Sequence, residues 1–139
     1  MSRYERYEQG TGRLLEVIDF PDLPPTADDV VAERERRLAL GFDYVFGDAR
    51  GTHRIGTTPA DMLGWDEVTK LAQAAVVSGQ PTMTIPIVTD TGPVTVTALE
   101  WQSILIAAAL ARQPVWQASF VLQATVPIPS DYTADSHWT

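Results

Sequence analysis

The side chains that most often perform covalent chemistry are scarce in this sequence. It contains no cysteine, which excludes disulfides, thiolate metal sites and a cysteine nucleophile. Its histidines, the side chains whose ordinary pKa lies near neutrality, are His53 and His137. Neither belongs to a His-x-x-x-His pair, and the sequence has no Gly-x-Ser-x-Gly elbow and no Walker loop. We therefore expect His53 to be a solvated hairpin residue, no position to be catalytic, and the chain not to be an enzyme.

Acidic side chains gather in the middle of the chain, where they could bind a cation. Asp43, Asp48, Asp61 and Asp66 lie within a short span, but they form no Asp-x-Asp-x-Asp-Gly loop. Asp61 and Asp66 also fall near the start of an expected helix, where the helix dipole favours acids without any ligand. We predict no metal site and no cofactor.

The overall charge argues against a nucleic-acid partner. The formal net charge is −8, from 18 acidic and 10 basic residues. A protein that binds a phosphate backbone normally presents a basic face, because neutralising phosphates supplies much of the affinity. The one basic cluster, Arg34, Arg36 and Arg37, is interleaved with Glu33 and Glu35.

Membrane insertion is not expected either. The longest uninterrupted apolar run, Ile104 to Ala111, is far shorter than the roughly 20 residues that span a bilayer. The first ten residues, MSRYERYEQG, contain no apolar stretch of the kind that a secretory signal requires.

Charge is spread unevenly along the chain. Residues 1–57 hold 11 acids and 8 bases, whereas residues 58–139 hold 7 acids and 2 bases. Between Leu71 and Ser130 the charged residues are Asp90, Glu100 and Arg112. A free surface usually carries charge at about a quarter of its positions or more. The second half therefore has either a large core or surface buried against neighbours, and we favour subunit contacts in a homo-oligomer.

The pattern of apolar, capping and turn residues predicts an α+β fold. Helices are expected over 26–40, from Thr58 to Gly79, and from Thr97 to Pro114, with the first helix peripheral. Pro114 should break or kink the last helix, and residues 115–123 then form either a further helical turn or a strand. Short antiparallel hairpins are expected over 42–55 and 83–96. Trp65 and Trp101 fall on core faces of the helices. The expected core also includes Leu71, Ala75, Ile85, Ile87, Val96, Leu99, Ile104 and Leu105.

Both ends of the chain read as extended arms around a domain at 26–123. Residues 1–25 contain one apparent strand, 13–20, followed by a proline-rich stretch; they form either a disordered leader or a strand that adds to a partner's sheet. Residues 124–139 form the C-terminal arm. Apolar and aromatic side chains in and near these arms are the candidate contact residues: Leu15, Val17, Ile18, Phe20, Trp116, Tyr132 and Trp138.

Several stretches carry a resemblance to a known family. They are the charged helix and hairpin ERERRLALGFDYVFGD with the return His53–Gly56, the hairpin and helix start VTVTALEWQSILIAAALA, and the leader YEQGTGRLLEVIDF. Over about residues 1–20 and 33–112, the chain resembles a domain family of unknown function found in bacteriophage tail-region proteins, often tail-fibre or fibre-accessory proteins. Pro114 departs from the family, in which this helix usually continues, and the tail VLQATVPIPSDYTADSHWT is longer and more apolar.

The resemblance implies a virion structural protein of the tail tip, baseplate or fibre. Its partners would be other tail proteins and its own copies, with a trimer expected because fibre-like proteins of the resembled group are usually trimeric. It would be made in the bacterial host cytoplasm and end in the virion tail. The alternatives are a tail-fibre assembly chaperone that is absent from the mature virion and a tail-borne wall hydrolase, for which no site residue can be named. If the arms prove dispensable, the functional surface is the charge-poor face between Leu71 and Gln113.

Overall fold

The computed structural model describes residues 2–20 and 23–139, with backbone alone for 2–4 and 15–20. It confirms the predicted α+β fold. The helices are α1 (Ala27–Leu38), α2 (Pro59–Val77) and α3 (Ala98–Ala124), and a 3-10 turn, η1 (Asp135–His137), lies near the end. The described strands form antiparallel hairpins: β1 (Ser2–Tyr7) with β2 (Leu14–Phe20), β3 (Phe42–Val45) with β4 (Thr52–Ile55), and β5 (Thr84–Thr89) with β6 (Gly92–Thr97).

Each α-helix starts at a threonine that is followed, three residues on, by an acid. The threonine hydroxyl accepts from the backbone N–H of the acid, and the carboxylate accepts from the threonine N–H, which satisfies two of the free donors at the helix start. The pairs are Thr26 with Asp29, Thr58 with Asp61, and Thr97 with Glu100. These boundaries match the sequence prediction because capping is a local interaction.

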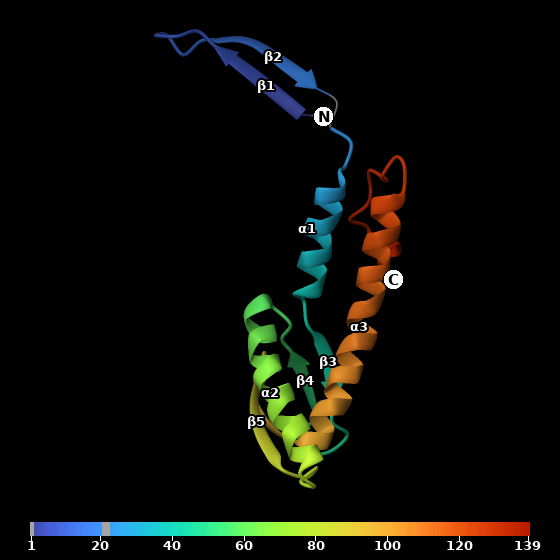
Figure 1. The fold of residues 1–139 in the computed structure, drawn as a ribbon. Coiled ribbons are helices and arrows are strands. Elements are labelled where there is room, and N and C mark those ends of the chain that lie inside the picture. Colours follow the sequence, from blue (N-terminus) through green and yellow to red (C-terminus); the bar gives the residue numbers. More distant parts are fainter. Residues whose placement is uncertain (1, 21–22) are drawn as a thin grey trace.

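Helix α3 is the element against which both parts of the body pack (Figure 1). Its first half lies beside α2 and the β3–β4 and β5–β6 hairpins, and its second half runs alongside α1. The main core sits in the first of these regions, where Trp65 of α2 meets Trp101 and Ile104 of α3. The two indole rings pack edge to face, with centroids 4.9 Å apart.

A second, smaller core joins α1, the end of α3 and the C-terminal segment. Val30, Leu122 and Trp138 are all buried there, and Tyr132 packs against them. Helix α1 contributes no residue to the main core, in line with the peripheral position predicted for it, but its Val30 is fully buried in this second core.

The predicted core is confirmed except at two positions. Ala75, Ile85, Val96 and Ile104 are buried, and Ile87 and Leu105 are half-buried against the same cluster. By contrast, Leu71 and Leu99 are 42% and 54% exposed. Apolar residues surround α3 on nearly every side, so periodicity alone does not identify its packed face.

Pro114 does not end α3, so the helical alternative for the residues after it is the one observed. The helix continues ten residues beyond it, to Ala124. A proline inside a helix removes one backbone donor and costs about 3 kcal/mol. Ser119 and Leu122, which follow it, are buried against α1, and this packing offsets the cost.

The ends of the chain also differ from the prediction of extended arms. Residues 125–139 turn back instead of extending, because Trp138 inserts into the second core and donates from its indole nitrogen to the carbonyl of Tyr132 at 2.7 Å. At the other end, β2 has a local partner, because β1 pairs with it in the antiparallel direction. The register runs from Ser2 opposite Phe20 to Tyr7 opposite Leu14, with an irregularity between Arg6 and Tyr7. The leader is thus a hairpin rather than a single strand.

Candidate subunit-contact surfaces

The N-terminal hairpin holds four of the predicted contact residues, Leu15, Val17, Ile18 and Phe20. The side chains of these residues lie outside the part of the chain that is described, but their backbone forms β2. Within the described residues, neither β1 nor β2 pairs with a third strand, so each keeps an open edge that another sheet can join. Figure 1 shows this hairpin beyond the N-terminal end of α1, away from both cores. An isolated two-stranded hairpin is marginally stable in water, which favours docking on a partner.

The three aromatic candidates are placed differently from one another. Trp138 is 3% exposed and belongs to the chain's own second core, so it is not a surface anchor. Tyr132 is half-buried beside it. Trp116, on α3, remains 36% exposed, and the Arg34 guanidinium stacks over its ring 4.3 Å from the centroid. Of the three, Trp116 presents the most side-chain surface to a partner.

An ion-pair network fastens the C-terminal segment to α1. Glu33 is buried and accepts from Nη2 of Arg36 at 2.6 Å and from Nε of Arg37 at 2.9 Å. Hydrogen bonding from Arg36 is the main reason that the pKa of Glu33 lies below its usual value. Arg37 also donates to the Thr133 carbonyl at 2.9 Å and to Asp135 at 2.8 Å. The network is therefore structural, and of it the sequence showed only that these arginines are interleaved with glutamates.

A second network fixes the β3–β4 turn. Arg50 donates to Asp48, to Glu100 at 3.0 Å and to the Thr95 carbonyl at 3.0 Å, and stacks on Phe46. Its hydrogen bonds lower the pKa of Asp48 to about 2. These contacts join the turn to β6 and to the start of α3. The carboxylates of Asp48 and Glu100 therefore stabilise the fold.

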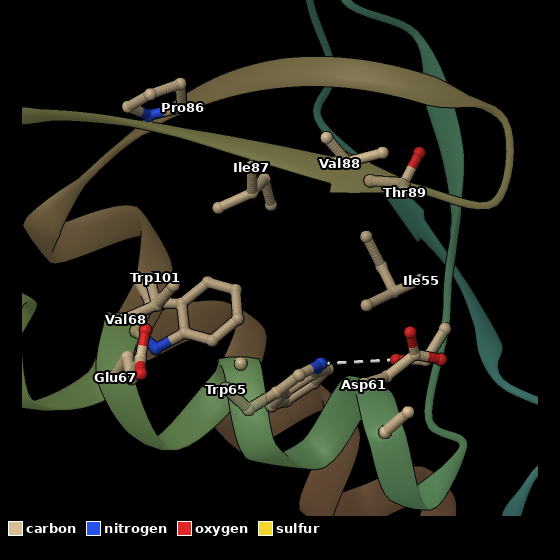
Figure 2. Close-up of a pocket in the computed structure, with 13 residues that line it drawn as sticks. Ile55, Asp61, Trp65, Glu67, Val68, Pro86, Ile87, Val88, Thr89 and Trp101 are labelled. Carbon is tan, nitrogen blue, oxygen red and sulfur yellow. Dashed lines mark hydrogen bonds between the residues drawn. The ribbon is translucent and has the colours of Figure 1, made fainter.

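A pocket of about 370 Å³ lies between α2 and β5. Figure 2 shows Trp65 and Trp101 on its helix side and Ile87 and Val88 on its strand side. The indole of Trp65 donates to the Gly56 carbonyl at 3.2 Å, and the indole of Trp101 donates to Thr69 at 3.0 Å. The Asp61 carboxylate at its rim caps α2. The two indoles and the Asp61 carboxylate are thus engaged in holding the fold, and the pocket is also lined by the exposed Glu67.

His53 is half-buried rather than solvated. Its Nδ1 lies 2.8 Å from the Thr89 hydroxyl and 3.3 Å from that of Thr91, and the Phe46 ring packs edge-on against it. The imidazole thereby joins β4 to the β5–β6 turn. His137 instead lies 2.9 Å from Asp131 in the C-terminal segment. Each histidine has a structural contact, and the two lie on different parts of the molecule.

Among the described residues, no group of three or more His, Cys, Asp or Glu side chains could hold a metal ion. Over the same part of the chain, every buried side-chain nitrogen or oxygen has a hydrogen-bond partner. The polar interior is therefore fully used by the fold.

The least expected feature is the outer face of α3. Leu99, Ile106, Leu110 and Val121 are each more than half exposed. By length and composition, α3 is the described helix that could cross a membrane, although core helices of soluble proteins pass the same test. The signal in the sequence was that apolar residues continue on both sides of this helix. Of these four residues, Leu99 is the one that the sequence predicted to lie in the core.

Comparison with protein-family models, with curated proteins and with solved structures finds no match to this chain.

Proposed function

We propose that this chain is a virion structural protein of a bacteriophage tail, an adaptor in the tail tip, baseplate or fibre that acts through subunit contacts. One contrast carries the proposal. The buried polar side chains of the described residues all have hydrogen-bond partners, whereas the C-terminal half exposes large apolar side chains with hardly any charge among them. An exposed apolar surface of this kind is typical of a subunit that is covered by neighbours.

The sequence resemblance supports the tail as the place of assembly. It covers both the N-terminal hairpin and most of the body, at about residues 1–20 and 33–112. In this proposal the open edges of β1 and β2 add to the sheet of another tail protein, which would stabilise a hairpin that is marginal alone. The chain would form a homo-oligomer, with a trimer expected from the resemblance. Nucleic-acid binding, membrane insertion, metals and cofactors have no part in it.

A tail-fibre assembly chaperone is the second candidate. The same exposed apolar surface would suit a protein that covers a fibre subunit until assembly and then leaves. The two functions differ in where the protein is found at the end of infection. A structural subunit stays in the mature particle, whereas a chaperone remains in the host cytoplasm.

Mass spectrometry of purified particles of the phage that encodes the chain separates these functions. We expect the chain to be present at a fixed ratio to other tail proteins. Its absence from infectious particles would contradict the structural role and favour the chaperone.

Deletion of residues 1–20 tests the hairpin in the same system. The truncated chain should keep its helical circular dichroism, because the two cores lie outside the hairpin, yet fail to enter particles. Val126→Ala, at a site 92% exposed, is the matched control and should be incorporated normally. Normal yields of infectious particles from the truncated chain would show that the hairpin is dispensable.

A further inference from the structure

Helix α3 has two faces of different character. The packed face includes Trp101, Ile104 and Ala108, which are all buried. Successive residues of an α-helix are rotated by about 100°, so Leu110, nine residues after Trp101, points to the opposite side. The same outer side carries a row that we call the α3 stripe: Leu99, Ile106, Leu110, Gln113, Gln117 and Val121. All six are exposed.

The α3 stripe carries no charge. All of Ala98–Ala124 is described, and its charged residues, Glu100 and Arg112, are engaged away from the stripe. Glu100 pairs with Arg50, and Arg112 donates to the Leu38 carbonyl at 2.9 Å. A helix face left in water normally carries charged side chains along its length. An uncharged row of about 33 Å, from residue 99 to residue 121, therefore indicates a covered surface.

We propose that the α3 stripe is the interface with a second copy of this chain. From Leu99 to Gln117 its residues recur at steps of seven, four, three and four, which is close to the 3.5-residue repeat that lets side chains of two like helices interlock. In a parallel, in-register bundle, each stripe residue of one copy lies opposite the same residue of the other copy. Leucine then meets leucine, and the amides of Gln113 and Gln117, which can both donate and accept, meet amides.

A lipid surface fits the same stripe less well. Helices that lie on membranes usually carry Lys or Arg on their polar face, whereas α3 has a single arginine, which is bonded to α1. The net charge of −8 would also oppose an anionic membrane. Crossing a bilayer would remove Trp101, Ile104 and Ala108 from the main core.

This inference rests on the proposed function in one respect, since both involve contacts between copies, but their tests are separate. Light scattering on the 139-residue chain at micromolar concentration should give a multiple of its 15.3 kDa mass. Leu110→Glu should shift the protein to the monomer, because the new carboxylates would be buried against one another. We expect the concentration of half-dissociation to rise at least about 100-fold.

The matched control is Leu63→Glu, at a site on α2 that is 72% exposed and off the stripe. It should leave the mass unchanged, and both variants should keep the wild-type circular dichroism, since neither side chain is in a core. A wild-type monomer, an oligomer that survives Leu110→Glu, or equal dissociation by Leu63→Glu would each overturn the proposal.

Vesicle flotation tests whether the α3 stripe binds a lipid surface instead. Wild-type protein mixed with phosphatidylcholine vesicles, or with vesicles that also contain phosphatidylserine, should stay unbound. Binding that is lost in Leu110→Glu would assign the stripe to lipid and overturn the proposal. None of these results bears on whether the chain is present in particles, which mass spectrometry decides separately.

Discussion

Arg112, in the middle of α3, donates from Nη1 to the carbonyl oxygen of Leu38 at 2.9 Å. Leu38 is the last residue of α1, where backbone carbonyls lack partners within the helix and the helix dipole is negative. The Thr57 hydroxyl donates to the same oxygen at 2.6 Å. One carbonyl thus joins α1, α3 and the segment before α2, at the boundary between the two cores.

Replacing Arg112 by methionine should destabilise the protein by about 1 kcal/mol. Methionine keeps an apolar stem but removes the bond to Leu38, and Thr57 continues to satisfy part of that carbonyl. Burial already lowers the pKa of Arg112, so removing the charge recovers some desolvation cost. Urea unfolding measures the difference. Arg54→Met, which removes a similar bond to the Leu40 carbonyl at a more exposed site, should cost less. An unchanged midpoint in Arg112→Met would show that the contact adds nothing.

Ile104→Ala should be much more damaging, at about 2–5 kcal/mol. The side chain is fully buried in the main core, so truncation leaves a cavity that its neighbours only partly fill. Leu105→Ala should cost less, because that side chain is half-buried. Thermal or urea unfolding with Leu63→Ala as the exposed control tests the order. A cost for Leu105→Ala equal to that for Ile104→Ala would contradict the assignment of the packed face.

The local parts of the fold could be predicted from the sequence. Thr26, Thr58 and Thr97 each have their capping acid three residues away, so the helix starts needed no tertiary information. Hairpins β3–β4 and β5–β6 followed equally from alternation and turn residues.

Features that depend on distant contacts could not be predicted in this way. Pro114 should break a helix by local rules, and it is tolerated because Ser119 and Leu122 pack on α1. Trp138 is close to the end of the chain, but its position is set by Val30, more than a hundred residues earlier. Leu99 had the spacing of a core residue on a helix that is apolar nearly all round, so only the fold shows which side is open.

Trp138→Ala should release the C-terminal segment. Truncating a buried tryptophan typically costs about 3–5 kcal/mol, and here it would expose Val30 and Leu122 to water. We expect a lower melting temperature and faster proteolysis within residues 125–139. Val126→Ala, at a fully solvated site in the same segment, should change neither. Unchanged proteolysis of Trp138→Ala would mean that the segment is held by its polar contacts alone.

Acid should loosen the C-terminal segment, because Glu33 accepts a hydrogen bond from Arg37 and so holds the Arg37 guanidinium against that segment. Hydrogen bonding from Arg36, with that from Arg37, keeps the pKa of Glu33 below its ordinary value of 4.5. A carboxyl with a lowered pKa in the folded state stabilises the fold above its ordinary pKa. That stabilisation is lost as the pH falls from about 4.5 through the lowered folded value. Arg37 would then lose its ion pair with Glu33, which holds its guanidinium in position to bond the Thr133 carbonyl and Asp135.

Nuclear magnetic resonance of the indole protons provides the measurement. The Trp138 signal, whose proton is bonded to the Tyr132 carbonyl, should shift or broaden below pH 4.5. Glu33→Gln should show the loosened signal already at neutral pH and respond little to further acid from this source. Glu35→Gln is the control, since its side chain is 56% exposed and lies outside the Glu33–Arg37 contact. A Trp138 signal that is equally insensitive to acid in the wild type and in Glu33→Gln would show that this network does not hold the C-terminal segment.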